Sequence, residues 1–187
     1  MMPADALDTL RGFDAIYFGS AGDPRVPDHI SLWKLRLAIC QGLDQYANIR
    51  PTRLLPGLSS PLKDGTSETI DWFIVRENSE GEYSGAGGCV HQGRGSEVGM
   101  DVSVITREGA ERIQRFAFDV ARSRPRKKLI LVTKSNAQRH AMVLWDDVFE
   151  EVKQDYRDVT AERVLVDALA SRLETDPPRL DTVGTTS

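Results

Sequence analysis

The chain has 187 residues, a hydrophobic content of 40%, a charged content of 28% and a formal net charge of -4. This length is enough for one domain with a sizeable core, or for one domain and part of another. Acidic and basic residues are interleaved, which argues against a nucleic-acid-binding surface, and no apolar run approaches the roughly 20 residues of a membrane span.

The use of cysteine indicates the compartment. Cys40 and Cys89 are the only cysteines, and the sequence has no CxxC pair and no histidine at ligand spacing. Neither a zinc site nor a disulfide framework is therefore indicated. A reducing, cytoplasmic setting is the simplest expectation.

The first predicted elements are a helix, a strand and a second helix. Residues 1–12 are expected to form the end of an amphipathic helix that stops at Gly12, and residues 14–19 a short buried strand. Residues 31–46 repeat apolar side chains at helical spacing, and either Asp28 or Ser31 could cap the start of this helix. Further along, Pro51 favours an extended conformation at Arg50.

An apolar run at 72–75 predicts a buried strand, and a polar, glycine-punctuated turn follows it. The turn carries Arg76 and Tyr83. A guanidinium offers a planar fork to a carboxylate and a tyrosine offers a phenolic proton, so an acid-binding enzyme site is one interpretation. The other is an arginine on a strand edge with a tyrosine packed under a loop.

Residues 84–99 are rich in glycine. A phosphate-binding loop is one interpretation, but the segment lacks Gly-Lys-Ser/Thr and no helix follows directly. A hairpin or protruding arm fits the pattern better.

The rest of the chain alternates between strands and helices. Strands are expected at 100–106, at 128–133 and at 159–166, where the last ends in Asp167. Helices are expected from 106 to the residues before Pro125, over 143–156 and over 168–173. This alternation predicts an α/β fold, in which polar residues after a strand, such as Lys134, lie where ligands usually bind.

Residues 76–85, Arg-Glu-Asn-Ser-Glu-Gly-Glu-Tyr-Ser-Gly, resemble the signature of the β-decarboxylating dehydrogenases. This family includes the isocitrate, isopropylmalate and tartrate/D-malate dehydrogenases, and the segment before Arg36 is most similar to the tartrate/D-malate branch. The resemblance implies an isopropylmalate-dehydrogenase-like α/β fold and NAD-dependent oxidative decarboxylation of a small 2-hydroxy diacid.

The resemblance also implies roles for particular residues. Tyr83 would be the proton donor and Lys134 the catalytic base. A Mg²⁺ or Mn²⁺ ion would use Asp167, and the nicotinamide end of NAD would meet Asn136. The implied substrate-binding residues are Ser31, Arg36, Arg50 and Arg76.

The resemblance further implies a domain plan and a homodimer. Residues 1–41 would be part of a first domain, 42–183 a second domain with a dimerisation arm near 84–99, and 184–187 a tail. Two alternatives stay open: a non-catalytic, dimerising fragment of this family, and an isopropylmalate or isocitrate dehydrogenase. A substrate panel would separate the second alternative from the tartrate/D-malate expectation.

Overall fold

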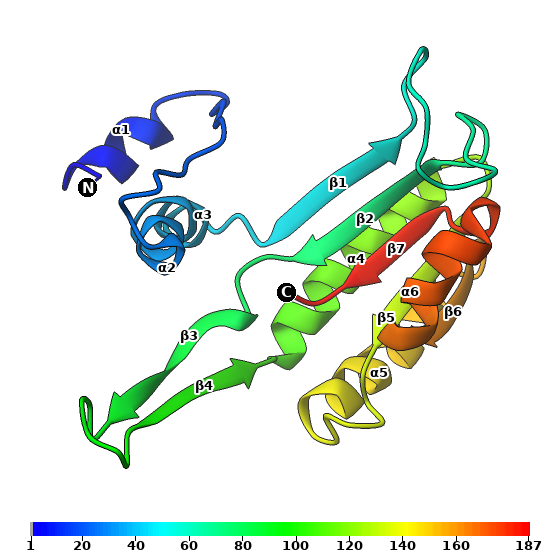
Figure 1. The fold of residues 1–187 in the computed structure, drawn as a ribbon. Helices are drawn as coiled ribbons and strands as arrows, with labels where there is room; N and C mark the ends of the chain where they lie inside the picture. The colour runs from blue at the N-terminus through cyan, green and yellow to red at the C-terminus, as the bar shows by residue number, and fades with distance from the viewer. Residues whose placement is uncertain (1) are drawn as a thin grey trace. The chain divides into compact units, whose positions relative to one another are not determined.

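The computed structural model describes residues 2–187 and divides the chain into two compact units, Met1–Tyr46 and Ala47–Ser187 (Figure 1). The expected boundary lay earlier, between residues 41 and 42. The first unit extends further because its last turn bonds back to the helix before it: the amide of Leu43 donates to the carbonyl of Ile39 at 3.0 Å, and that of Gln45 to Cys40 at 2.8 Å.

The first unit is helical. Helix α1 (Ala6–Arg11) accounts for the helix predicted over 1–12, of which Met1 lies outside the described residues. The helix predicted over 31–46 is confirmed in type but is built from three pieces: α2 (Asp28–Ser31), a π-helical turn (Leu32–Arg36) and α3 (Leu37–Gly42). Neither Asp28 nor Ser31 caps it, since Pro27 occupies the N-cap position.

The strand predicted over residues 14–19 is wrong. In the described structure these residues form no strand, and Tyr17 is fully exposed. A single extended segment gains little from its backbone groups unless a neighbouring strand pairs with them, and a short apolar run cannot indicate whether such a neighbour is present.

The second unit is built on a five-stranded sheet in the order β1-β2-β7-β5-β6. Strands β2 (Asp71–Glu77), β7 (Thr182–Thr185), β5 (Lys128–Thr133) and β6 (Thr160–Leu165) are mutually parallel, whereas β1 (Ala47–Arg53) runs antiparallel to β2. With three helices beside this sheet, the predicted α/β class is confirmed.

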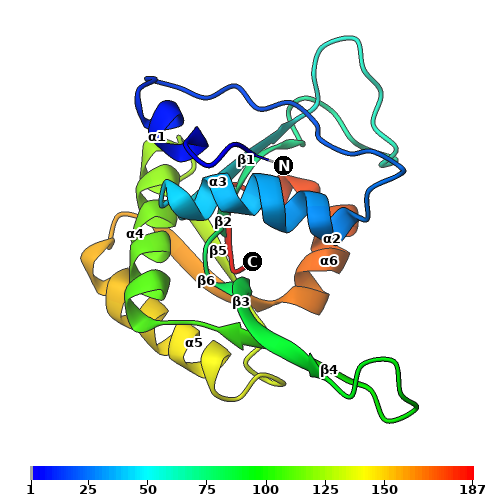
Figure 2. The same ribbon diagram turned by 90° about the vertical axis from the view of Figure 1, so that its left-hand side faces the viewer.

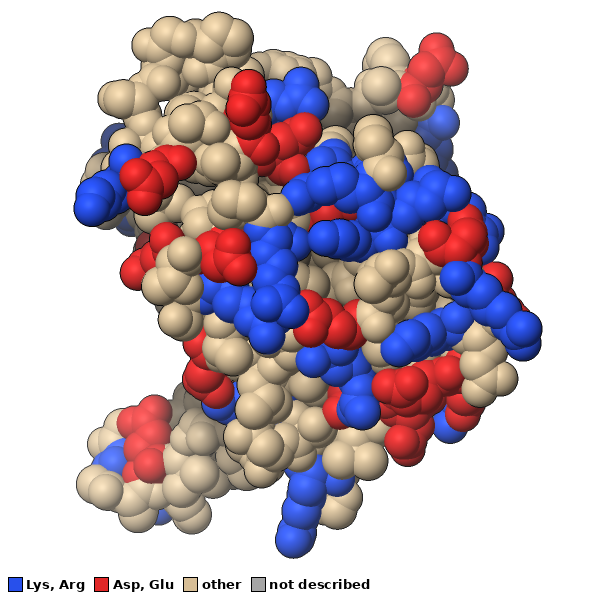
Figure 3. All heavy atoms as spheres, turned by 90° about the vertical axis from the view of Figure 1, so that its right-hand side faces the viewer, with Lys and Arg blue, Asp and Glu red and all other residues tan. Residues whose placement is uncertain are grey.

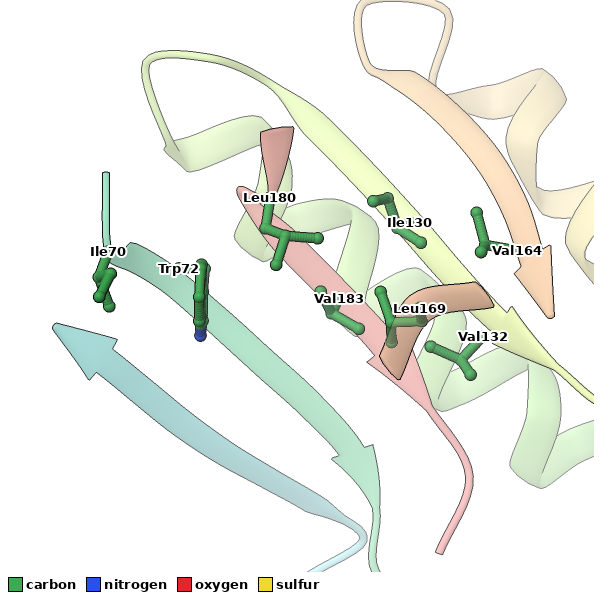
Figure 4. Close-up of a cluster of buried hydrophobic side chains, with 8 residues drawn as sticks. All are labelled: Ile70, Trp72, Ile130, Val132, Val164, Leu169, Leu180 and Val183. Atoms are coloured by element: carbon green, nitrogen blue, oxygen red, sulfur yellow. The ribbon is translucent and has the colours of Figure 1, made fainter. Parts of the chain in front are cut away.

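Helices cover both faces of the sheet. Figure 2 views the sheet nearly edge-on, with α4 (Arg107–Ser123) and α5 (Ala141–Val152) on one side and α6 (Val166–Thr175) on the other. Under α4 and α5, the rings of Phe118 and Phe149 stack with centroids 5.7 Å apart. Under α6, Leu169 packs among buried side chains of four strands and their flanks (Figure 4), namely Ile70, Trp72, Ile130, Val132, Val164, Leu180 and Val183.

Strand β7 was not predicted, because residues 184–187 were expected to be a tail. Gly184 instead lies in the middle of the sheet, opposite Val75 on one side and Leu131 on the other. A Cβ atom at this position would lie 3.2 Å from a methyl carbon of Leu131 and 3.4 Å from Ala117. The glycine therefore lets α4 pack closely on the sheet.

Two predicted boundaries at the carboxyl end also shift. Helix α5 ends at Val152, followed by a short 3-10 turn (Lys153–Asp155), and a second such turn (Pro177–Arg179) precedes β7. Strand β6 ends at Leu165, so Asp167 lies in the first turn of α6 rather than at the end of a strand.

Strands β3 (Gly81–Val90) and β4 (Val98–Val104) form a separate antiparallel hairpin, as expected for residues 84–99. The hairpin projects from one end of the sheet (Figure 2). Its second strand exposes apolar side chains, with Met100 51% and Val102 53% accessible. The hairpin, residues 81–104, is called the arm below.

The opposite ends of the strands are held by a buried carboxylate. Asp181 is 1% exposed, and it accepts a hydrogen bond from Arg124 Nε at 2.6 Å and another from the amide of Lys128 at 3.1 Å. Arg124 also lies 4.6 Å from the ring centroid of Phe73. The basic run after α4 therefore has a structural role where β2, β5 and β7 begin.

Charged side chains of both signs are interleaved on the face drawn in Figure 3. Ion pairs join neighbouring elements of the second unit, such as Arg163 on β6 with Asp146 on α5 at 2.6 Å, and Arg172 on α6 with Glu162 on β6 at 3.2 Å. This pairing leaves no uniformly basic field on the face that the figure shows.

Candidate functional site

The candidate site lies where the parallel strands end. Arg76 and Thr185 are paired in the register of β2 and β7, Lys134 follows β5 directly, and Asp167 follows β6. Because β1 is antiparallel to β2, it begins at this same edge, with Ala47 opposite Glu77. Ligands of open α/β sheets usually bind at this edge.

The structure brings Arg76 and Tyr83 together, as a joint site requires. The guanidinium carbon of Arg76 lies 4.7 Å from the centroid of the Tyr83 ring. A cation over a ring face is attracted by the electron density of the ring, which favours one orientation of both groups. A residue at the end of β2 and a residue on β3 thus form one unit.

Arg50 lies on the same face of the sheet as Arg76. In the β1–β2 register Asn48 is opposite Arg76, and Arg50 is two residues further along β1. Directly opposed residues of an antiparallel pair project to one face, and so do residues two apart on one strand. Two guanidinium groups on one face can bind two carboxylates, as a diacid requires.

Two glutamates hold the turn between Arg76 and Tyr83, and sequence reasoning missed both contacts. Glu77 is 2% exposed, and its carboxylate accepts hydrogen bonds from Ser79 Oγ at 2.6 Å and from the Glu80 amide at 2.6 Å. Glu80 in turn accepts hydrogen bonds from the amide and hydroxyl of Thr106, the N-cap of α4, at 2.9 and 2.5 Å. The two glutamates thereby fix the segment that leads into Tyr83.

Lys134 and Asp167 form an ion pair across the ends of β5 and β6. The hydrogen bond from the Lys134 ammonium and its charge hold the pKa of Asp167 below its usual value of 3.8. The Asp167 side chain is 69% exposed. Lys134 also lines a pocket of about 290 Å³, together with Glu82, Gln138 and the residues at the end of β7.

Ser31 and Arg36 belong to the first unit, where both line a pocket of about 700 Å³ with His29 and Leu32. Their predicted contribution to the site of the second unit stays a prediction. Asn136 lies in the exposed turn after β5, where the amides of Ala137 and Gln138 each donate to the Lys134 carbonyl at 2.9 Å. Its side-chain amide is accessible to a ligand.

The described residues can contribute only part of a metal site. They contain no cluster of three or more His, Cys, Asp or Glu side chains placed to hold an ion. Asp167 offers one carboxylate, which is already paired with Lys134. This chain's described side chains therefore do not fit Mg²⁺ or Mn²⁺ as a complete ligand set, because these ions take several oxygen ligands.

No helix in the described part of the chain is long and apolar enough to cross a membrane.

A family model described as isocitrate/isopropylmalate dehydrogenase matches residues 1–187. The chain is 57% identical over 187 residues to a probable tartrate dehydrogenase/decarboxylase of Agrobacterium vitis, covering 100% of this chain and 52% of that protein. It is 46% identical over 184 residues to the decarboxylating D-malate dehydrogenase of Escherichia coli strain K12, covering 98% and 51%.

Among solved structures, isocitrate dehydrogenase from Methylococcus capsulatus is similar with a TM-score of 0.80 and 29% identity, covering 99% of this chain and 52% of that one. The expected isopropylmalate-dehydrogenase-like α/β fold agrees with this likeness. The chain spans about half the length of the curated relatives it matches.

Proposed function

The chain belongs to the isocitrate/isopropylmalate dehydrogenase family, and on this basis we propose that it contributes the site for NAD-dependent oxidative decarboxylation of a four-carbon 2-hydroxy diacid, D-malate or tartrate. The observation that carries the proposal is the stacking of Arg76 against Tyr83, 4.7 Å from guanidinium carbon to ring centroid, with Arg50 on the same face of the sheet as Arg76. Decarboxylating dehydrogenases of both substrates are among its relatives.

In this proposal Arg50 and Arg76 bind the carboxylates of the substrate through the paired N–H groups of each guanidinium. Ser31 and Arg36 are also proposed as substrate-binding residues, on the resemblance alone. Asn136 holds the nicotinamide end of NAD, which supplies the hydride acceptor when bound. The substrate is therefore clamped at both ends before any bond breaks, which lowers the entropic part of the barrier.

Lys134 is the proposed base: its side chain, in the neutral amine form after losing a proton to solvent, takes the proton of the substrate hydroxyl as the carbon–hydrogen bond breaks. Loss of carbon dioxide from the resulting keto acid leaves an enolate, and the Tyr83 hydroxyl donates the proton that its carbon needs. Asp167 is proposed as one ligand of Mg²⁺ or Mn²⁺. The ion pair keeps Asp167 in its charged form, as a ligand must be.

The arm supports a homodimer as part of the proposal. Its exposed apolar residues, including Met100 and Val102, would be covered by a second copy of the chain. Lys134 and Asp167 would then act in the site of the neighbouring copy. A non-catalytic, dimerising fragment is the second candidate function, and the same arm favours it. We also propose a cytoplasmic location, in keeping with the free Cys40 and Cys89.

The test is NADH formation by the purified chain with Mn²⁺, offered D-malate, tartrate and isopropylmalate in turn. We expect turnover of D-malate or tartrate that falls in Tyr83→Phe and is retained in Tyr17→Phe, a matched control at a fully exposed tyrosine. Turnover of isopropylmalate alone would contradict the proposed substrate. A folded dimer that turns over none of the three diacids would favour the dimerising fragment.

A further inference from the structure

Asn48 occupies the position between the two arginines of the second unit. It is opposite Arg76 in the β1–β2 register and two residues before Arg50 on β1. All three residues therefore project to the same face of the sheet. Neither the resemblance nor the sequence pattern assigned Asn48 a role.

The contacts of Asn48 determine which way its amide points. Its Oδ1 atom accepts a hydrogen bond from Arg50 Nε at 3.2 Å, and its Nδ2 atom donates to Asn78 Oδ1 at 3.4 Å. A guanidinium has only donors, so the amide oxygen must face Arg50 and the amide nitrogen must face away. Asn78 is 3% exposed and thus gives Asn48 a fixed support.

The bond to Nε leaves the other edge of the Arg50 guanidinium available. Within the described part of the chain, the hydrogen bond to Asn48 is the only one that the Arg50 side chain forms. The Nη1 and Nη2 atoms can therefore both donate to one carboxylate in the parallel, two-bond arrangement that arginine favours. An arginine without such support samples many rotamers and loses more entropy on binding.

We propose that Asn48 is a positioning residue. The buried Asn78 holds the amide of Asn48, and this amide orients Arg50 to bind a dicarboxylate. The inference rests on the proposed function, because it assumes that Arg50 binds a substrate carboxylate. It deepens that function by assigning part of the affinity for the diacid to a residue that does not touch it.

Two measurements on the full chain test this inference, both made on Asn48→Ala and on Thr52→Ala. Thr52 lies on the same strand and face, opposite Trp72, and serves as the matched control. The first is proton exchange at Arg50 Nε by NMR without ligand, with the signal assigned by its loss in Arg50→Lys. The second is the dissociation constant for D-malate and for tartrate by calorimetry, with thermal unfolding to confirm the fold.

We expect Asn48→Ala to lose the protection of the Arg50 Nε proton and to bind the diacid about three- to tenfold more weakly. The Thr52→Ala control should change neither. An unchanged Nε signal or an unchanged dissociation constant in a folded Asn48→Ala variant overturns the inference alone. If the unsubstituted chain binds neither diacid, the proposed function is overturned, and the inference with it.

Discussion

The guanidinium of Arg76 lies against the ring of Tyr83, with 4.7 Å between the guanidinium carbon and the ring centroid. The proposed carboxylate-binding residue and the proposed proton donor therefore orient each other. The ring and the hydroxyl of Tyr83 have separate functions in this arrangement, and two substitutions can separate them.

Tyr83→Phe keeps the ring and removes the acid, so we expect the affinity for D-malate or tartrate to be retained while turnover falls by about 10²- to 10⁴-fold. Tyr83→Leu removes both. Loss of a partly exposed cation–ring contact of about 0.5–1 kcal/mol should weaken diacid binding a further two- to fivefold. Calorimetry and NADH formation on both variants make the comparison; equal affinity in Phe and Leu would contradict a positioning role for the ring.

The ion pair of Lys134 and Asp167 predicts a pH dependence. The folded-state pKa of Asp167 is lowered by the hydrogen bond and the charge of Lys134. The stabilisation from this pairing is therefore fully present above the unfolded-state pKa of 3.8 and is lost as the pH falls through the lower folded-state pKa. We expect the Asp167 carboxyl carbon to titrate below 3.8 by NMR.

Lys134→Met should return the Asp167 midpoint to its ordinary range, whereas Lys153→Met, at a lysine that lies over the ring of Phe149, should not. The melting temperature should change little in Lys134→Met, because exposed ion pairs contribute little to stability. A midpoint that stays low without Lys134 would show that another group sets the pKa of Asp167.

The contacts at the other end of the sheet predict a large effect on stability. Asp181 is 1% exposed and bonds Arg124, whose side chain is 13% exposed. Asp181→Ala removes the closer of the two carboxylates that this largely buried guanidinium contacts and leaves only Asp71, at 3.5 Å, which should cost about 3 kcal/mol in urea unfolding. Asp158→Ala, which breaks an exposed pair with Arg122, is the control and should change the unfolding midpoint much less. Similar losses in both variants would rule out burial as the cause.

The sequence was most informative for strands that are buried between helices on both faces of the sheet. The apolar runs at 72–75 and 128–133 predicted β2 and β5, and Lys134 followed from the end of β5. Strand β7 was missed because Thr182–Thr185 has one large apolar residue and a glycine, and its burial comes only from its place between two strands distant in sequence. Local patterns carry no information on such pairing.

The same reason explains the missed site residues. The sequence predicts that Glu77 and Glu80 belong to a polar, glycine-containing turn, where charged residues are normally solvated. Their carboxylates are instead turned onto backbone amides and onto Thr106, a contact across a large separation in sequence. The roles of Arg50, Arg76, Tyr83 and Lys134 came from the resemblance. What the resemblance could not supply was Asn48, whose role depends on the register of β1 against β2.

The arm gives the last prediction, on assembly. Val102 is 53% exposed and Met100 51% exposed, on a hairpin whose outer strands make no contact with the five-stranded sheet through backbone pairing. If a second copy covers these side chains, Val102→Asp places a charge in an apolar interface and should convert the dimer to a monomer in sedimentation velocity.

Leu55→Asp is the matched control, because Leu55 is 57% exposed in a loop outside the arm. We expect Leu55→Asp to leave the dimer intact and both variants to keep their circular dichroism. Dissociation of neither variant, or of both equally, would show that the arm is not the contact between copies. If the proposed function is also right, the Val102→Asp monomer should lose NADH formation, since Lys134 and Asp167 would no longer reach the site of a neighbouring copy.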